Sequence, residues 1–189
     1  METAIQDVLN VIKYNELEDV VIAGHSFAGK VAAGVADRVP EKVKLLLYLD
    51  AFHPAKVRTP QGVFNPGEEF HPPPGSWTVP FTETIIDSIG KDVKGPDREW
   101  LLTKATPWPM KHATDPVTLS EKFDAVKSAY VFCGGGFGGD GDYLDDILAG
   151  KTGKLDGPYK VIESGHWPMV TKPAELVEEM LSLAQDSTP

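Results

Sequence analysis

The segment that most constrains the fold runs from Val20 to Gly29 (VVIAGHSFAG) and places one serine, Ser26, between an apolar run and a helical pattern. The apolar part, Val20–Ala23, has the β-branched composition of a buried strand. After the serine, Gly29–Val39 carries apolar residues at helical spacing. A strand that turns into a helix through Gly-x-Ser-x-small is typical of a nucleophile elbow, in which the serine Oγ projects from a sharp turn. The sequence therefore predicts an exposed, nucleophilic serine at a strand end.

Small residues on both sides of the serine support this interpretation. Gly24 and Ala28 lie two positions before and two positions after Ser26. A sharp strand-to-helix turn brings backbone atoms close together and leaves no room for larger side chains. The usual motif has glycine at the second of these positions. Alanine is small enough to replace it, so the departure is mild.

Apolar runs and helical patterns alternate along the rest of the chain. The expected strands are Val20–Ala23, Val43–Leu49, Ala129–Cys133 and Tyr159–Ile162, and the expected helices are 3–14, Gly29–Val39, 143–148 and 173–183. Strands joined by helices form parallel sheets with right-handed crossovers. At 189 residues the chain is long enough for one domain and too short to expect two. We predict a single α/β domain over residues 1–189, a three-layer sandwich with a mostly parallel sheet of about four strands.

A proline-rich insertion separates the second and third expected strands. Most of the prolines fall between Pro54 and Pro116. Because proline lacks a backbone donor, we expect no sheet there and only two short helices, near Glu83–Ile89 and Asp97–Lys104. We interpret residues 54–127 as a cap or lid within the domain, the alternative being a packed surface excursion. Aromatic residues available to line an apolar pocket beneath it are Trp77, Phe81, Trp100, Trp108 and Trp167.

A serine hydroxyl needs a base within hydrogen-bond reach, and the base needs an acid to orient it. His166 directly follows the last expected strand, at the sheet edge where active sites collect. The other histidines lack this placement: His25, His53, His71 and His112. We expect His25, although next to the serine, to face the other side of the elbow. The acids placed at strand ends are Asp50 and the Asp140/Asp142 pair.

Composition excludes several classes of partner. Acidic residues outnumber basic ones by 28 to 18, and the net charge of −10 disfavours nucleic acids and anionic membranes. Cys133 is the only cysteine, so we expect no internal disulfide. We also expect no signal peptide, no membrane span and no metal site. A cytoplasmic protein is the resulting expectation.

Two glycine-rich segments also resemble nucleotide-binding patterns. Gly24–Val31 (GHSFAGKV) is one residue away from G-x-x-x-x-G-K-[ST], but Val31 replaces the hydroxyl that would bind Mg²⁺. Gly134–Gly139 satisfies G-x-G-x-x-G after a strand, yet Asp140 and Asp142 would repel a pyrophosphate there. We therefore favour nucleophilic catalysis over nucleotide binding.

Three longer segments carry a resemblance to the esterase and hydroxynitrile-lyase-like branch of the α/β-hydrolase superfamily. They are VVIAGHSFAGKVAAGVADRVPEKVKLLLYLDAFHP at the elbow, WLLTKATPWPMKHATDPVTL in the cap, and SGHWPMVTKPAELVEEML at the histidine loop and final helix. The resemblance covers the chain from residue 3 onward. It implies a carboxylesterase-like serine hydrolase that cleaves small hydrophobic esters through an acyl-enzyme, without a cofactor. The implied roles are Ser26 as nucleophile, His166 as base and the Phe27 N–H as oxyanion donor.

The acid of the triad is the open assignment. Many relatives place it just after the third strand, where this chain has Gly136. Asp140 and Asp142 lie further along that loop and serve equally well as helix caps. Some hydrolases place the acid at the end of the preceding strand, where this chain has Asp50. We favour Asp50 over this pair. A cyanohydrin lyase would use the same triad with an additional lysine, and no lysine stands at a strand end, so hydrolysis ranks ahead.

The resemblance also implies strands before the elbow, one of them followed by a loop that supplies a second oxyanion N–H. The sequence shows only a helical pattern there. We therefore expect a weakened oxyanion hole and an unpaired edge at Val20–Ala23, which favours a homo-oligomer or a partner chain at that edge. The alternative function is a catalytically weak or inactive relative that serves as a binding or assembly module.

Overall fold

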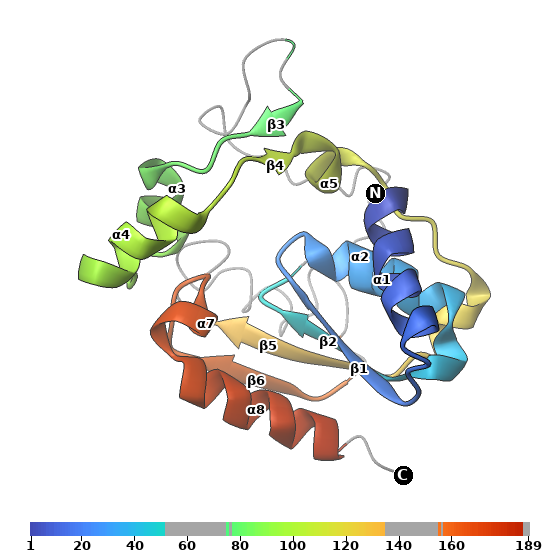
Figure 1. Cartoon of the computed structure of the whole chain (residues 1–189). Coiled ribbons are helices and arrows are strands. Elements are labelled where there is room, and N and C mark those ends of the chain that lie inside the picture. Colours follow the sequence, from blue (N-terminus) through green and yellow to red (C-terminus); the bar gives the residue numbers. More distant parts are fainter. Residues whose placement is uncertain (52–74, 76, 135–154, 156, 187–189) are drawn as a thin grey trace.

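Four parallel strands form the centre of the molecule (Figure 1). The computed structural model describes residues 1–51, 75, 77–134, 155 and 157–186 of the chain. The strands lie in the order β1 (Val20–His25), β2 (Val43–Leu49), β5 (Ser128–Cys133) and β6 (Tyr159–Ile162). All neighbouring pairs are parallel, so the predicted sheet is confirmed at each of its expected strands.

Helices cover both faces of this sheet, which confirms the predicted three-layer sandwich. The helices are α1 (Glu2–Tyr14) and α2 (Ala28–Arg38) on one face and α8 (Pro173–Asp186) on the other (Figure 1). In β2, Leu46 and Tyr48 pack on the α2 side. Leu45 and Leu47 pack on the α8 side. Successive side chains of a strand point to opposite faces, so a strand covered on both faces needs the continuous apolar run VKLLLYL.

The carboxyl ends of the strands meet at one edge of the sheet. His25 pairs with Leu49, and Leu49 pairs with Val131, so β1, β2 and β5 end near the same level. Cys133 pairs with Ile162 and extends that edge to β6. Side chains that follow these strands are therefore brought together although they are far apart in the sequence.

The described part of the insertion is built from short elements. They are β3 (Thr78–Val79), α3 (Glu83–Ile89), α4 (Gly95–Lys104), β4 (Trp108–Pro109), α5 (Met110–Thr114) and η3 (Glu121–Ala125). The two expected helices are present as α3 and α4. The expectation that no sheet forms here is wrong, because β3 and β4 pair antiparallel. A pairing of two residues per strand needs few backbone donors, and Pro109 lies at its end.

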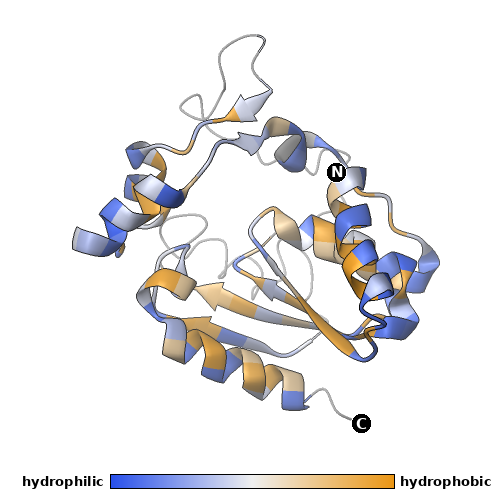
Figure 2. Cartoon of the chain, viewed as in Figure 1, coloured by the Kyte–Doolittle hydropathy of each residue, from blue (hydrophilic) through white to orange (hydrophobic). Residues whose placement is uncertain are grey.

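Apolar residues concentrate along the inner strands, as the orange colour of β5 shows in Figure 2. Every residue of β5 is buried. Two short helical turns complete the described chain: η1 (Pro40–Lys42) and α7 (Pro168–Thr171). None of the helices in this part of the chain is long and apolar enough to cross a membrane. The helix expected at 143–148 and the start of the insertion, 54–74, lie outside the described residues.

Candidate active site

The turn between β1 and α2 has the backbone of a nucleophile elbow. Ser26 has a φ of 55°, a left-handed conformation that is unfavourable for a residue with a side chain. Its N–H donates to the Leu49 carbonyl at 3.2 Å, which ties the turn to the end of β2. At Gly24 a Cβ atom would lie 2.7 Å from the Ala28 carbonyl oxygen. The tight turn therefore requires the glycine that the sequence supplies.

Asp50 and His166 form a buried pair at the same sheet edge. The His166 Nδ1 donates to the Asp50 Oδ2 at 2.6 Å, and each side chain is only 3% exposed. The other carboxylate oxygen, Oδ1, accepts the N–H of Cys133 at 3.4 Å. Asp50 also donates its own N–H to the Val131 carbonyl at 2.7 Å. A donor at Nδ1 leaves the Nε2 of a neutral imidazole as an acceptor, which is the tautomer a general base needs.

The loop after β6 carries His166 across the sheet edge, past the ends of β5 and β2. Its backbone N–H donates to the carbonyl of Ile89 in α3 at 2.8 Å. Close approach fixes this loop against the insertion, because a Cβ at Gly90 would lie 2.3 Å from the Trp167 ring. A Cβ at Gly165 would lie 2.1 Å from the Asp92 carboxylate. The α3 end of the insertion and the histidine loop are thus packed against each other.

His25 does not face away from the site, so that expectation is wrong. Its Nε2 lies 2.7 Å from the carbonyl oxygen of His166, and the two rings lie 4.4 Å apart between centroids. The reason is that the loop after β6 must cross two strands to approach the elbow, and it ends beside the last residue of β1. Burial lowers the pKa of His25 to about 4, with the nearby His166 as the second cause.

Phe27 links the elbow to the insertion. Its ring stacks on Trp108 at 5.7 Å and on His112 at 5.2 Å between centroids. Its backbone N–H precedes the first residue of α2, and none of the described residues accepts a hydrogen bond from it. Burial lowers the pKa of His112, so this ring stays neutral to a lower pH than a free imidazole does.

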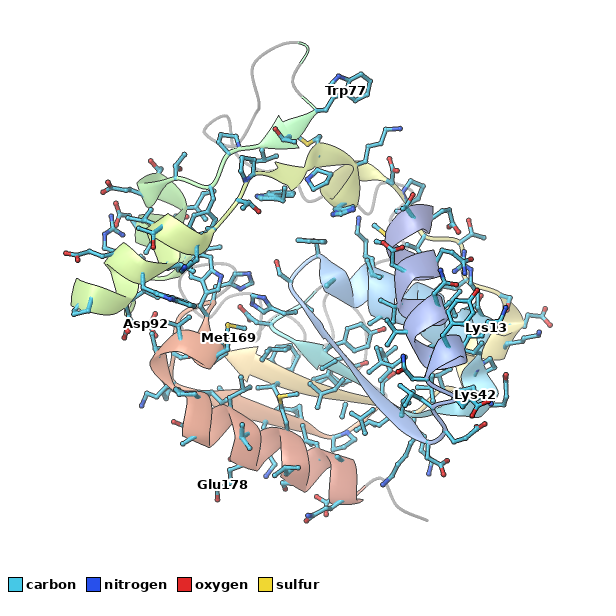
Figure 3. All side chains as sticks on the ribbon, in the orientation of Figure 1. Lys13, Lys42, Trp77, Asp92, Met169 and Glu178 are labelled. Atoms are coloured by element: carbon cyan, nitrogen blue, oxygen red, sulfur yellow. The ribbon has the colours of Figure 1, made fainter. Side chains whose placement is uncertain are left out.

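The aromatic residues expected beneath the cap divide into two groups. Trp77 is 77% exposed and projects from the outer end of the insertion (Figure 3), and Trp100 is 53% exposed. The expectation that these two line a pocket is therefore wrong, because more than half of each side chain is exposed to solvent. Trp108 stacks at the elbow as described. Phe81 packs edge-on against Trp167 at 5.7 Å.

The remaining candidate residues are the alternative acids, the single cysteine and possible metal ligands. Asp140 and Asp142, the alternative candidates for the acid, lie outside the described residues. Burial raises the pKa of the Cys133 thiol to about 12, which keeps it protonated and unreactive. Within the described ranges, no three His, Cys, Asp or Glu side chains gather to hold a metal ion. Sequence reasoning missed the Ile89 carbonyl, a backbone contact for which residue identity gives no signal.

The chain is similar to known proteins over nearly its whole length. The sequence model of a family described as "Alpha/beta hydrolase family" matches residues 2–179. A carbendazim hydrolyzing esterase from Nocardioides sp. (strain SG-4G) is 30% identical over 196 residues, which cover 97% of this chain and 78% of that protein. An alpha-hydroxynitrile lyase from Arabidopsis thaliana is 25% identical over 194 residues, covering 90% of this chain and 72% of the relative.

A solved structure shares the arrangement of strands and helices. An extracellular alpha/beta-hydrolase from a Paenibacillus species superposes with a TM-score of 0.76 over 95% of this chain and 77% of that one. The two sequences are 19% identical, a level at which the likeness concerns the fold alone. The fold described above is therefore shared with a protein of distant sequence.

Proposed function

The chain belongs to the alpha/beta hydrolase family and is an enzyme of the esterase type, and from this premise we propose that it is a serine hydrolase acting on small hydrophobic esters. One observation carries the proposal: the buried 2.6 Å bond between Asp50 and His166 stands at the same sheet edge as the strained serine turn. A base that is oriented by a carboxylate beside a serine elbow is the arrangement that nucleophilic acyl transfer needs.

In the proposed reaction the Ser26 Oγ attacks the ester carbonyl carbon while the His166 Nε2 takes the hydroxyl proton. The carbonyl electron pair moves to oxygen and then returns to expel the alkoxide, which leaves as an alcohol with the proton from His166. Water, activated by the same imidazole, attacks the acyl-enzyme and releases the carboxylic acid. Asp50 stays ionised and stabilises the imidazolium that forms in each half of the reaction.

The Phe27 N–H is the proposed donor to the oxyanion. It stands at the N-terminus of α2, where peptide N–H groups carry a partial positive charge and have no partner within the helix. Removing one oxyanion donor from a serine hydrolase lowers turnover on the order of 100- to 1000-fold. A site with a single donor would therefore be slow, and a second donor from another segment would raise the rate by a similar factor.

Support for an apolar substrate comes from the insertion. The stack of Trp108, Phe27 and His112 places aromatic surface beside the elbow, and Trp167 adds a second surface beside the proposed base. Flat apolar walls favour flat apolar acyl or alcohol groups. The Nocardioides relative is named as hydrolysing carbendazim. We assign residues 54–127 as the cap, which contributes Trp108 and His112 to the first of these surfaces.

The decisive test is covalent labelling of Ser26 with a fluorophosphonate probe. Wild-type protein should label, and Ser26→Ala should not, because the probe reacts only with an activated serine. Ser88→Ala is the matched control, since its hydroxyl bonds to the Ile85 carbonyl within α3. Label should persist in this variant. Absence of labelling in folded wild-type protein would contradict the proposal and favour a binding or assembly module.

Lyase chemistry on cyanohydrins is the alternative reaction at the same residues, as named for the Arabidopsis relative. Lys30 is the buried lysine of the described chain, and its Nζ donates to the Asp115 carbonyl at 3.1 Å. This contact holds the ammonium against the insertion, on a helix and not at a strand end. We therefore prefer hydrolysis. Release of cyanide from a cyanohydrin by wild-type protein that also reacts with the fluorophosphonate probe would reverse that preference.

A further inference from the structure

His166 is held at three points by three different elements. Its Nδ1 donates to Asp50 after β2, and its backbone N–H donates to Ile89 in α3. Its carbonyl oxygen lies 2.7 Å from the Nε2 of His25 at the end of β1. The first contact orients the imidazole, whereas the other two fix both peptide groups of the same residue. The position of the ring relative to the elbow is therefore set by its backbone as well as by its acid.

The contact with His25 has only one chemically consistent form. A carbonyl oxygen accepts and does not donate, so the His25 Nε2 must carry the hydrogen. Among the described residues, the charged or titratable groups that face this ring are His166 and Asp50. Burial and the neighbouring imidazole hold the pKa of His25 at about 4, so it donates as a neutral ring. A neutral donor adds no positive charge beside an imidazolium 4.4 Å away between ring centroids.

We propose that His25 is a positioning residue that ties the backbone of the base, His166, to the turn that carries the nucleophile. His25 directly precedes Ser26, so a displacement of the elbow carries the His166 peptide with it. This couples the position of the imidazole to the position of the serine oxygen. A misplacement of about 1 Å in such a pair costs on the order of 100-fold in rate. The inference rests on the proposed function.

Two substitutions separate the hydrogen bond from the bulk of the ring. His25→Gln keeps an N–H donor at similar reach, and His25→Leu keeps the volume but leaves the His166 carbonyl without this donor. We expect His25→Leu to lower kcat by about tenfold or more while KM changes by less than about twofold, because the ground-state substrate contacts are unchanged. We expect His25→Gln to recover kcat to within about threefold of wild type.

The matched control is Ser164→Ala, which removes a buried hydrogen bond to the carbonyl of the neighbouring residue, Gly165. It should leave kcat within about threefold of wild type, because the His166 N–H still donates to Ile89 and the His166 carbonyl oxygen still accepts from His25. Active wild-type enzyme together with fully active His25→Leu overturns the positioning role and leaves the proposed function intact. Equal losses of kcat in His25→Leu and His25→Gln also overturn the positioning role, because that role requires the N–H donor of glutamine to restore activity.

A measurement on wild-type protein keeps the inference testable if the variants do not fold or the enzyme shows no turnover. Imidazole nitrogen NMR should show His25 as the neutral Nε2–H tautomer at about pH 6, still neutral near pH 5. A ring that carries its hydrogen on Nδ1, or that titrates near its ordinary pKa, would overturn the inference. Failure of Ser26 to label, with the tautomer confirmed, would refute the proposed function and leave the contact established.

Discussion

The proposed role of Asp50 as the acid of the triad rests on the hydrogen bonds that its two carboxylate oxygens accept. Oδ2 accepts from His166 and Oδ1 accepts from the Cys133 amide. The residue itself has a φ of 39°, so the strand ends in an unfavourable backbone conformation at the point where the carboxylate turns toward the imidazole. Such strain persists where the surroundings hold it, here by the bond from the Asp50 N–H to Val131.

Replacing the carboxylate by an amide tests this assignment. Asp50→Asn should lower kcat on the order of 10,000-fold, because asparagine has one acceptor oxygen where Asp50 uses two. With its oxygen on the Cys133 N–H, its NH2 would donate to the His166 Nδ1 and impose the wrong tautomer, and a neutral amide does not offset the charge of the imidazolium. Asp37→Asn is the matched control, a buried aspartate that bonds to Ser120 away from the site. Ester hydrolysis under saturating substrate is the measurement. A large loss in Asp140→Asn with activity retained in Asp50→Asn would assign the acid to the other loop.

The lowered pKa of His25 gives a pH dependence of stability. In the folded state the His25 imidazole stays neutral down to about pH 4. In the unfolded chain it takes up a proton near its ordinary pKa of about 6.5. The unfolded state therefore binds more protons between about pH 6.5 and pH 4, and stability falls as the pH falls through this window. The stabilising contribution is fully present above that window.

Urea unfolding across this window measures the effect. Each differentially bound proton changes the unfolding free energy by at most about 1.4 kcal/mol per pH unit. The slope should be smaller in His25→Gln, which has no titrating group there. His112 also has a lowered pKa and remains in both proteins, so the difference between the two slopes reports His25 alone. Identical slopes would contradict the assignment of a lowered pKa.

At the scale of elements, the elbow depends on the close approach of β1 and α2. Gly24→Ala would place a Cβ 2.7 Å from the Ala28 carbonyl oxygen and 2.8 Å from the Gly29 Cα. Both are backbone atoms that cannot rotate away, so we expect destabilisation of about 1–3 kcal/mol. Chemical denaturation measures this, with loss of fluorophosphonate labelling as a second readout.

A glycine within α2 gives the comparison. Gly34→Ala places a Cβ 2.5 Å from the terminal methyl of Ile5 and 3.1 Å from the Arg38 guanidinium. These are ends of flexible side chains, and alanine favours the helix by about 1 kcal/mol over glycine. The cost at position 34 should therefore be smaller than at position 24. The reverse order would show that the elbow accommodates a methyl group.

The sequence predicts the sheet well because each strand is a short apolar run bounded by turns. Val43–Leu49 and Tyr159–Ile162 have the predicted bounds. The β3–β4 pairing escapes prediction, since a two-residue pairing leaves no periodic pattern. Ser26, Asp50 and His166 are predictable as strand-end residues. The His25 contact is not, because it depends on a loop crossing two strands, and neither loop path nor ring direction is encoded in local spacing.

At the scale of the whole molecule, β1 forms one edge of the sheet. Within the described residues it pairs with β2 alone, and Val21 is 39% exposed. An open edge presents unpaired backbone donors and acceptors, which favour pairing with another strand. The predicted association of a second copy at Val20–Ala23 rests on this geometry.

Light scattering at micromolar concentration measures the association. We expect a mass above that of one chain for wild type, and a shift toward the monomer in Val21→Lys, because a charged side chain on an edge opposes strand pairing. Val177→Lys is the matched control, since Val177 is 55% exposed on α8 away from this edge. A strictly monomeric wild-type protein would refute the association.

The bond from the His166 N–H to the Ile89 carbonyl has a mechanical consequence. His166, the proposed base, is bonded through its backbone N–H to the C-terminal end of α3. The position of that helix end therefore helps to set the position of the imidazole. In the proposed mechanism, a displacement of that end would move the His166 backbone and weaken the bond between its imidazole and Asp50. A movement of the insertion that admits substrate would therefore have to leave the contact between the C-terminal end of α3 and His166 intact during the reaction.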